Sequence, residues 1–419
     1  SPGGVGIRTD TLPGGLRLVT ETMADVRSVA VGFWVGTGSR DEADERAGAS
    51  HFLEHLLFKG TPDRSASSIA EALDEVGGDC NAFTTKEYTA FYVRMLGDDL
   101  DLGLDILSDI IWSPALRDEE VDSERQVILE EVLAHLDEPA DFAQERFADA
   151  MFPSHPLGRE VLGDPEVIKA VTVDEIRQFL AVHYRPANIV VAAAGQVDHG
   201  RIGEGLERRF AGVRGGAAPR RAAPSAAVRP VDVTVRDTEQ AHLVLGVRAP
   251  ARTSPSRYGL ALLNHVLGGG VSSRLFQKIR EERGLAYSVV SERVGFADSG
   301  AFVVSVGTAP DNASAVIDLV VAEFDALASS GITADELARA KSHVVADLLL
   351  GLEDSGNRMS RLGAGLLLFD EVLSVDEQLA RIDAVTLEEV GRLAAEVLGG
   401  RRVLAVVGPP GAGKFVPLG

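Results

Sequence analysis

Cysteine is nearly absent from this sequence, and its absence limits what can hold the fold together. Cys80 is the only cysteine among 419 residues, so no disulfide can form within the chain, and nothing indicates an oxidising compartment. There is no run of about 18 apolar residues, so no membrane-spanning helix is expected. The first residues, Ser1 to Gly4, do not form a basic segment followed by an apolar one, so no secretory signal is expected. These absences favour a cytoplasmic protein, and the excess of Arg over Lys is typical of a GC-rich bacterial genome.

Positive charge is also in short supply. Lys and Arg total 41 against 63 Asp and Glu, which gives a formal net charge of −22. Proteins whose main task is to bind nucleic acid present a basic face to the phosphates, so this class is disfavoured. The hydrophobic content of 45% and the charged content of 25% are ordinary for a globular protein. The acidic surface therefore indicates solubility, or a preference for cationic partners.

An internal repeat organises the chain. Residues 170–176 are similar to residues 384–390, at an offset of 214 positions. Each copy contains a Thr followed three positions later by a Glu, the pattern of a capping box at the start of a helix. Each helix leads to an apolar run that ends in glycine, 189–195 and 403–408, and such runs predict buried strands. The repeat indicates that one domain has been duplicated.

The resulting prediction is a first domain over 1–211, a linker over 212–228 and a second domain over 229–419. The linker has no apolar periodicity and contains paired glycines and two prolines. Strands and helices follow one another in mixed order in both domains. Long helices are expected over 118–150 and 373–397. We therefore expect an α+β fold, in which each domain is a mostly antiparallel sheet covered by helices.

A five-residue pattern in a predicted helix carries the chemistry: His51, Glu54 and His55. Positions i, i+3 and i+4 share one face of a helix, so the two imidazoles and the carboxylate point the same way. Two His one turn apart can bind one zinc ion, and the carboxylate can take a proton from zinc-bound water. A plain amphipathic helix is the alternative, but burying two His and a Glu on one face needs a further reason.

A third metal ligand is expected from a second helix. Zinc hydrolases usually have three protein ligands and leave one position open for water. Glu124 and Glu131 are seven positions apart, so they share a helix face, whereas Glu130 is rotated away by about 100°. Without the His motif, a solvated acidic helix would be the better explanation of this segment.

The H-x-x-E-H pattern, followed after 75 intervening residues by Glu131, resembles the pitrilysin or insulinase-type family of zinc peptidases. The similarity is to its branch of short subunits like the mitochondrial processing peptidase. The resemblance implies a metalloendopeptidase with one Zn²⁺ per chain, held by His51, His55 and Glu131. It also implies that Glu124 orients one of the ligand imidazoles by accepting a hydrogen bond from its other N–H group.

The resemblance extends to substrate binding. Residues 77–84 resemble the family's edge strand, to which the substrate backbone adds as an extra strand, with Asn81 and Ala82 in contact with the substrate. Arg280 and Tyr287, seven positions apart, resemble a pair that stabilises the developing oxyanion. The second half carries no zinc motif of its own.

Assembly follows from the same resemblance. Long family members have four such domains in a clamshell, and this chain corresponds to half of one. The resemblance therefore implies a homodimer that closes around unfolded peptides or presequence-like segments. Arg280 and Tyr287 would then complete the active site of the partner chain. The alternatives are a non-catalytic structural subunit, and an active subunit that needs a different, catalytically empty partner. A glycine-rich match to a nucleotide-binding loop over 408–414 is discounted, because Phe415 replaces the required Ser or Thr.

Overall fold

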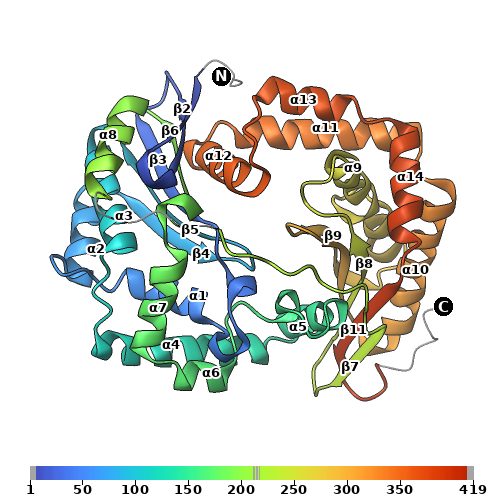
Figure 1. Cartoon of the computed structure of the whole chain (residues 1–419). Coiled ribbons are helices and arrows are strands. Elements are labelled where there is room, and N and C mark those ends of the chain that lie inside the picture. Colours follow the sequence, from blue (N-terminus) through green and yellow to red (C-terminus); the bar gives the residue numbers. More distant parts are fainter. Residues whose placement is uncertain (1–5, 211–212, 214–215, 217, 413–419) are drawn as a thin grey trace. The chain divides into compact units, whose positions relative to one another are not determined.

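Two β-sheets, each in a compact unit of its own, form the fold (Figure 1). The computed structural model describes residues 6–210, 213, 216 and 218–412, so parts of the predicted linker and of the glycine-rich match lie outside the described residues. One unit comprises Ser1–Val132, Glu160–Arg221 and Leu349–Val375, and the other comprises Leu133–Arg159, Ala222–Leu348 and Asp376–Gly419. One segment of the first half, Leu133–Arg159, therefore belongs to the second unit, and one segment of the second half, Leu349–Val375, belongs to the first. The domain boundaries at 1–211 and 229–419 stay a prediction.

The sheet of the first unit has the strand order β1-β2-β6-β3-β5-β4. All neighbours pair antiparallel except β2 and β6, which are parallel. Strand β4 is therefore an edge strand that pairs only with β5 among the described residues. The strands are β1 (Ile7–Thr11), β2 (Arg17–Thr22), β3 (Ser28–Val35), β4 (Asp79–Thr84), β5 (Thr89–Leu96) and β6 (Ile189–Gly195).

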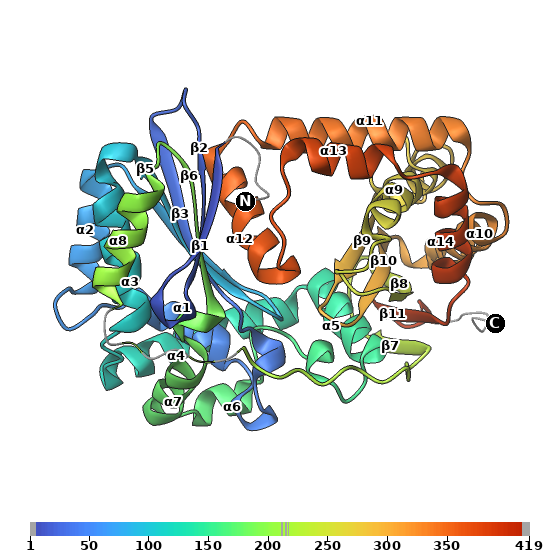
Figure 2. The same ribbon diagram turned by 45° about the horizontal axis from the view of Figure 1, so that its top comes forward.

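Helices cover both faces of this sheet, with α3 and α8 on one side and α12 on the other (Figure 2). Helix α12 packs against β3 and β6, although it begins about 160 residues after the end of β6 and about 320 after the end of β3. The helices of this unit are α1 (Ala49–Leu57), α2 (Ala66–Glu75), α3 (Leu100–Trp112), most of α4 (Asp118–Asp137), α6 (Pro165–Ala170), α7 (Val173–His183), α8 (His199–Arg209) and α12 (Ser355–Phe369).

The second unit repeats the plan with the strand order β7-β11-β8-β10-β9, in which only β7 and β11 pair parallel. Its strands are β7 (Val231–Val235), β8 (Ala241–Ala249), β9 (Ala286–Gly295), β10 (Gly300–Thr308) and β11 (Arg402–Gly408). Its helices are α5 (Pro139–Met151), α9 (Arg257–Gly268), a π-helical turn (Phe276–Glu281), α10 (Ala313–Ser330), most of α11 (Ala334–Gly351), α13 (Val375–Asp383) and α14 (Leu387–Leu398). The expected α+β fold of two helix-covered, mostly antiparallel sheets is thus confirmed.

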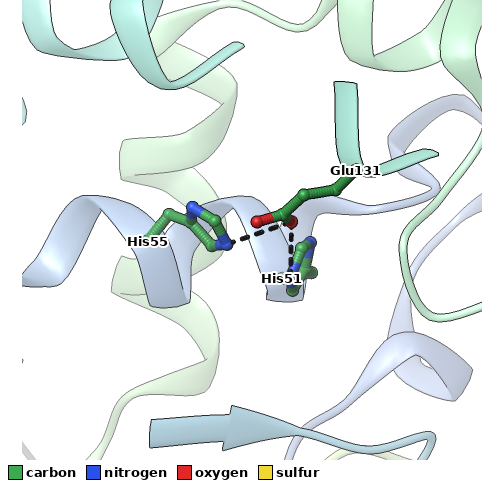
Figure 3. A group of neighbouring side chains, drawn as sticks. All are labelled: His51, His55 and Glu131. Carbon is green, nitrogen blue, oxygen red and sulfur yellow. Dashed lines mark ion pairs between the residues drawn. The ribbon is translucent and has the colours of Figure 1, made fainter. Parts of the chain in front are cut away.

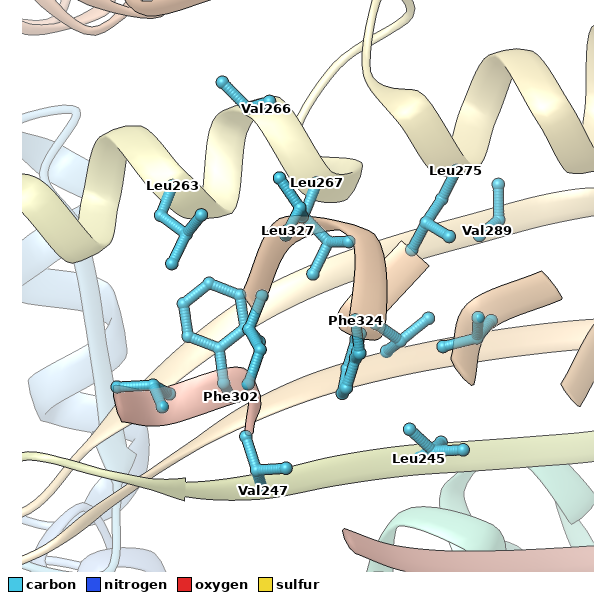
Figure 4. Packing of buried hydrophobic residues seen from close by; sticks show 14 of the residues in the cluster. Leu245, Val247, Leu263, Val266, Leu267, Leu275, Val289, Phe302, Phe324 and Leu327 are labelled. Carbon is cyan, nitrogen blue, oxygen red and sulfur yellow. The ribbon is translucent and has the colours of Figure 1, made fainter. Parts of the chain in front are cut away.

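The larger core of this unit lies between the sheet and helices α9, α10 and α14 (Figure 4). Phe302 and Phe324 are fully buried at its centre, and Leu245 and Val247 of β8 face them. Fully burying one such side chain stabilises the fold by roughly 1.5–3 kcal/mol. Helix α5 packs on the opposite face, against β8 and β11.

Two long helices expected from the sequence are each broken, so those two predictions were wrong. The segment 118–150 splits because Pro139 opens α5 after the N-cap Glu138, and a proline inside a helix removes a backbone donor. The segment 373–397 splits because Thr386 caps α14, with its side chain accepting from the backbone N–H of Glu389. The same cap forms at Thr172, so both predicted capping motifs start helices.

Across the described residues, no helix is both long enough and apolar enough to span a lipid bilayer.

Candidate active site

Helix α1 carries the two histidines, and contacts at its N-terminus help to fix its orientation. Its N-cap, Gly48, has a φ of +100°, and a Cβ there would lie 2.5 Å from the Ile168 side chain. The Glu42 carboxylate accepts hydrogen bonds from the backbone N–H groups of Gly48 (2.8 Å) and Ser50 (2.7 Å). A carboxylate there satisfies unpaired donors and complements the helix dipole.

Apolar side chains of α1 bury the opposite face. Phe52, Leu53 and Leu57 are completely buried and Leu56 is 1% exposed, so the helix cannot rotate without exposing its core contacts. His51, Glu54 and His55 are therefore held on the remaining face, as the predicted i, i+3, i+4 spacing requires.

The structure brings Glu131 of α4 to the two imidazoles (Figure 3). Its Oε2 lies 3.7 Å from His51 Nε2 and 3.5 Å from His55 Nε2. The three donor atoms lie within 4.8 Å of one another, and no other group of three His, Cys, Asp or Glu side chains converges in this way among the described residues. Two imidazole nitrogens and a carboxylate oxygen are ligands that zinc accepts, so the donor set fits this metal.

Burial sets the charge of the first imidazole. Burial, and then the neighbouring His55, lower the pKa of His51 from 6.5 to about 4. His51 is therefore neutral near pH 7, with a lone pair available to a cation. The Glu131 side chain is 42% exposed whereas that of His51 is 12% exposed, so the group opens to solvent on the Glu131 side.

Glu124 lies behind His55, where the resemblance places it. Its Oε2 is 3.1 Å from His55 Nδ1, and its Oε1 is 2.6 Å from Lys59 Nζ. Since a carboxylate only accepts, His55 donates through Nδ1, which leaves the Nε2 lone pair facing Glu131. A buried acid in this place fixes the tautomer and the orientation of a ligand imidazole. Lys59, which no sequence pattern indicates, balances the charge of Glu124.

Glu54 lies close to His55 and Glu131, and it has a hydrogen-bond partner, Thr84, that the sequence did not indicate. The hydroxyl of Thr84 in β4 donates a 2.5 Å hydrogen bond to Glu54 Oε2. Burial is the main cause that raises the pKa of Glu54, and the Thr84 hydrogen bond acts in the opposite direction. A carboxylate with a raised pKa is suited to act as a general base near neutral pH.

Strand β4 holds the residues predicted to contact a substrate. Asn81 is exposed, and its Oδ1 accepts from the backbone N–H of Ala82 at 2.8 Å, while Ala82 itself is half-buried. Cys80, directly before Asn81 in the strand, is half-buried, and burial, followed by the charge of Asp79, raises its pKa to about 12. Its thiol therefore stays protonated, and the strand offers main-chain groups rather than a nucleophile.

Arg280 and Tyr287 lie together in the second unit, whereas the two histidines and Glu131 belong to the first. The Arg280 guanidinium carbon is 4.7 Å from the Tyr287 ring centroid, and Nη1 donates to the Tyr287 carbonyl at 3.3 Å. The register of β9 and β10 shifts at this point, between Gly307 and Thr308. This irregularity re-aims the Tyr287 side chain, which is 80% exposed.

Comparison with known proteins agrees with this arrangement. Residues 17–165 match the family model described as insulinase (peptidase family M16), and residues 170–344 match the model of the peptidase M16 inactive domain. The group that could hold a metal ion, His51, His55 and Glu131, lies entirely in the first of these segments. The chain is 46% identical to an "uncharacterized zinc protease" of Streptomyces coelicolor, over 97% of this chain and 90% of that protein. It is 36% identical to a Bacillus subtilis protein of the same description, over 97% and 99% of the two chains.

Solved structures share the fold. A protease from Helicobacter pylori has a TM-score of 0.90 at 24% identity and covers 96% of this chain and 99% of its own. A Pseudomonas fluorescens structure titled peptidase M16 inactive domain has a TM-score of 0.91 at 21% identity, and it covers 99% of this chain and 100% of its own. At such identities the likeness concerns the fold alone. On the level of identity to its full-length relatives, the chain belongs to the M16, or insulinase, family of peptidases.

Proposed function

We propose that this chain is a zinc-dependent endopeptidase with one Zn²⁺ per chain. The observation that carries the proposal is the convergence of His51, His55 and Glu131, with Glu54 on the same helix face and Glu124 behind His55. When bound, zinc polarises a carbonyl and lowers the pKa of water. The relatives described as zinc proteases support this metal.

The side chains of this site divide the remaining work. Glu54 accepts the proton of the attacking water and delivers it to the leaving amine, because its carboxylate lies on the same face as the ligands. Glu124 keeps the His55 lone pair directed toward the metal position. Apolar burial of α1 keeps Glu54 and His55 fixed, so little reorganisation is needed during the reaction.

The substrates we propose are extended peptides. The open edge of β4 offers backbone groups to a peptide strand, with Asn81 and Ala82 as contact positions. Main-chain pairing gives affinity with little demand on sequence, and it excludes folded proteins, whose backbones are already paired. The net charge of −22 favours basic segments, such as presequence-like peptides.

A peptide-library comparison tests the activity. The parental chain is expected to contain about one zinc per chain and to cut peptides, and Glu54→Gln to keep the zinc but lose at least about 100-fold in activity. A chain that binds no zinc and cuts nothing would instead be the non-catalytic subunit. The description "inactive domain" for the model matching residues 170–344 is the observation that keeps this second candidate in view.

We further propose a homodimer in which Arg280 and Tyr287 serve the zinc site of the partner chain. Mixing Glu54→Ala and Tyr287→Phe chains under conditions of subunit exchange tests it. Half of the dimers are then mixed, each with one intact site, so about a quarter of the parental activity should return. Activity no higher than that of either variant alone would exclude sharing across chains. A mass measurement of the active species separates the homodimer from a pairing with a different subunit.

A further inference from the structure

Thr84 is fixed in place by the hairpin that it belongs to. It is the last residue of β4 and pairs with Thr89 at the start of β5. The turn between them is closed by the hydroxyl of Thr85, which accepts from the backbone N–H groups of Glu87 (3.2 Å) and Tyr88 (3.1 Å). A strand end held by such a turn has little freedom, so the Thr84 hydroxyl occupies a defined position.

Glu54 depends on that hydroxyl for its orientation. In the described part of the chain, Thr84 is the hydrogen-bond donor found for the Glu54 carboxylate, and no Lys or Arg lies within ion-pair distance of it. The torsion at the end of a Glu side chain is broad, so a carboxylate without a donor samples many orientations. With Oε2 bound to Thr84, Oε1 remains the oxygen available to accept a proton.

Thr84 also belongs to the strand proposed to bind the substrate. It follows Asn81 by three positions, about 10 Å along an extended strand. A peptide that pairs with β4 therefore binds the same rigid segment that holds the base. We infer that Thr84 is a positioning residue for Glu54, which it holds in line with a substrate on β4. This inference rests on the proposed function.

Two conservative substitutions separate this role from a purely structural one. Thr84→Val keeps the volume and the β-branching but removes the hydroxyl. Thr84→Ser keeps the hydroxyl but removes the methyl group and lowers the strand propensity. A positioning role predicts that Ser is tolerated and Val is not, whereas a structural role predicts the reverse. Thr9→Val, at an exposed position in β1, is the matched control.

The activity assay uses the zinc-loaded full chain and a peptide that the parental chain cuts. We expect Thr84→Val to lower kcat by about 10- to 100-fold with KM changed by less than about twofold. Thr84→Ser should stay within about threefold of the parental kcat, Thr9→Val should be unchanged, and all variants should retain zinc. Full activity in Thr84→Val, or an equal loss in Thr84→Ser, would overturn the inference.

A second readout does not depend on catalysis. In the zinc-free chain with Glu54 present, Thr84→Val is expected to raise the equilibrium constant for unfolding by about tenfold, because the Glu54 carboxylate loses its hydrogen bond. In a Glu54→Ala background the same substitution should have a much smaller effect. Equal effects in both backgrounds would overturn the inference. If the parental chain cut no peptide at all, the proposed function would fall, and this cycle alone would decide whether Thr84 holds Glu54.

Discussion

The guanidinium of Arg221 donates two parallel hydrogen bonds to the carboxylate of Asp41, from Nε to Oδ1 and from Nη2 to Oδ2, each 2.8 Å long. Arg221 also donates to the backbone carbonyls of Gly36 and Glu87. It is the last residue of its segment in the first unit, so this contact fixes the point at which the chain leaves that unit. Bidentate pairs of this kind combine strength with a defined geometry.

We expect Arg221→Ala to destabilise the first unit by about 3 kcal/mol, because it leaves a buried carboxylate without its cationic partner. The Asp41 side chain is 1% exposed and that of Arg221 is 18% exposed. The exposed pair Arg94–Asp354, with side chains 49% and 42% exposed, is the control, and Arg94→Ala should cost less than about 1 kcal/mol. Urea unfolding of both variants measures the two losses. Equal losses would show that the Arg221 contact contributes no more than a surface ion pair.

Glu124→Gln is expected to weaken zinc binding by about 10- to 100-fold, because a neutral amide holds His55 less firmly than a carboxylate does. The substitution also removes the negative charge that lies 2.6 Å from Lys59 Nζ. Competition with a chelator at neutral pH measures the affinity. Glu130→Gln is the matched control, since Glu130 is exposed and adjacent to the proposed ligand Glu131 without belonging to the group that Glu131 forms with the histidines. A similar loss in both variants would mean that general charge, and not the His55 contact, tunes the metal.

Acid should destabilise the metal-free chain through His51. Its pKa is lowered from 6.5 to about 4 on folding, so the unfolded chain takes up the proton first as the pH falls. The associated stability is complete above about pH 6.5 and is lost as the pH falls toward 4, which makes unfolding about 2 kcal/mol easier at pH 5 than at pH 7.5. His51→Gln cannot titrate, so its unfolding free energy should depend less on pH by that amount. Identical pH dependence in the two chains would rule out a neutral, buried His51.

The metal group could be predicted because each of its parts is local or regularly spaced. His51 and His55 are one helical turn apart, and the spacing to Glu131 follows the family pattern, so no knowledge of packing was needed. Thr84, Glu42 and Arg221 escaped prediction because each acts through a contact that the chain makes only after folding. A hydroxyl in a strand or an Arg near a linker carries no periodic signal of such a contact.

Helix α12 was not predicted for a related reason. Gly356, Gly363 and Gly365 lie within its 15 residues, and glycine in a helix interior costs up to about 1 kcal/mol each relative to alanine. The helix forms because Met359 and Leu362 pack on the first sheet, which outweighs the poor local propensity. The sequence shows the cost at these positions but not the packing that offsets it.

Gly363 shows why packing decides here. A Cβ at this position would lie 2.2 Å from Nε1 of Trp34, a side chain that is 2% exposed in the core beneath α12. We expect Gly363→Ala to destabilise the first unit by roughly 1–3 kcal/mol, although alanine favours a helix, because the indole cannot move aside in a filled core. Gly391→Ala in α14 is the matched control, since nothing lies within 4 Å of its added methyl group. That variant should gain up to about 1 kcal/mol from helix propensity alone. Thermal unfolding distinguishes the two, and a stabilised Gly363→Ala would show that α12 does not sit against Trp34 as described.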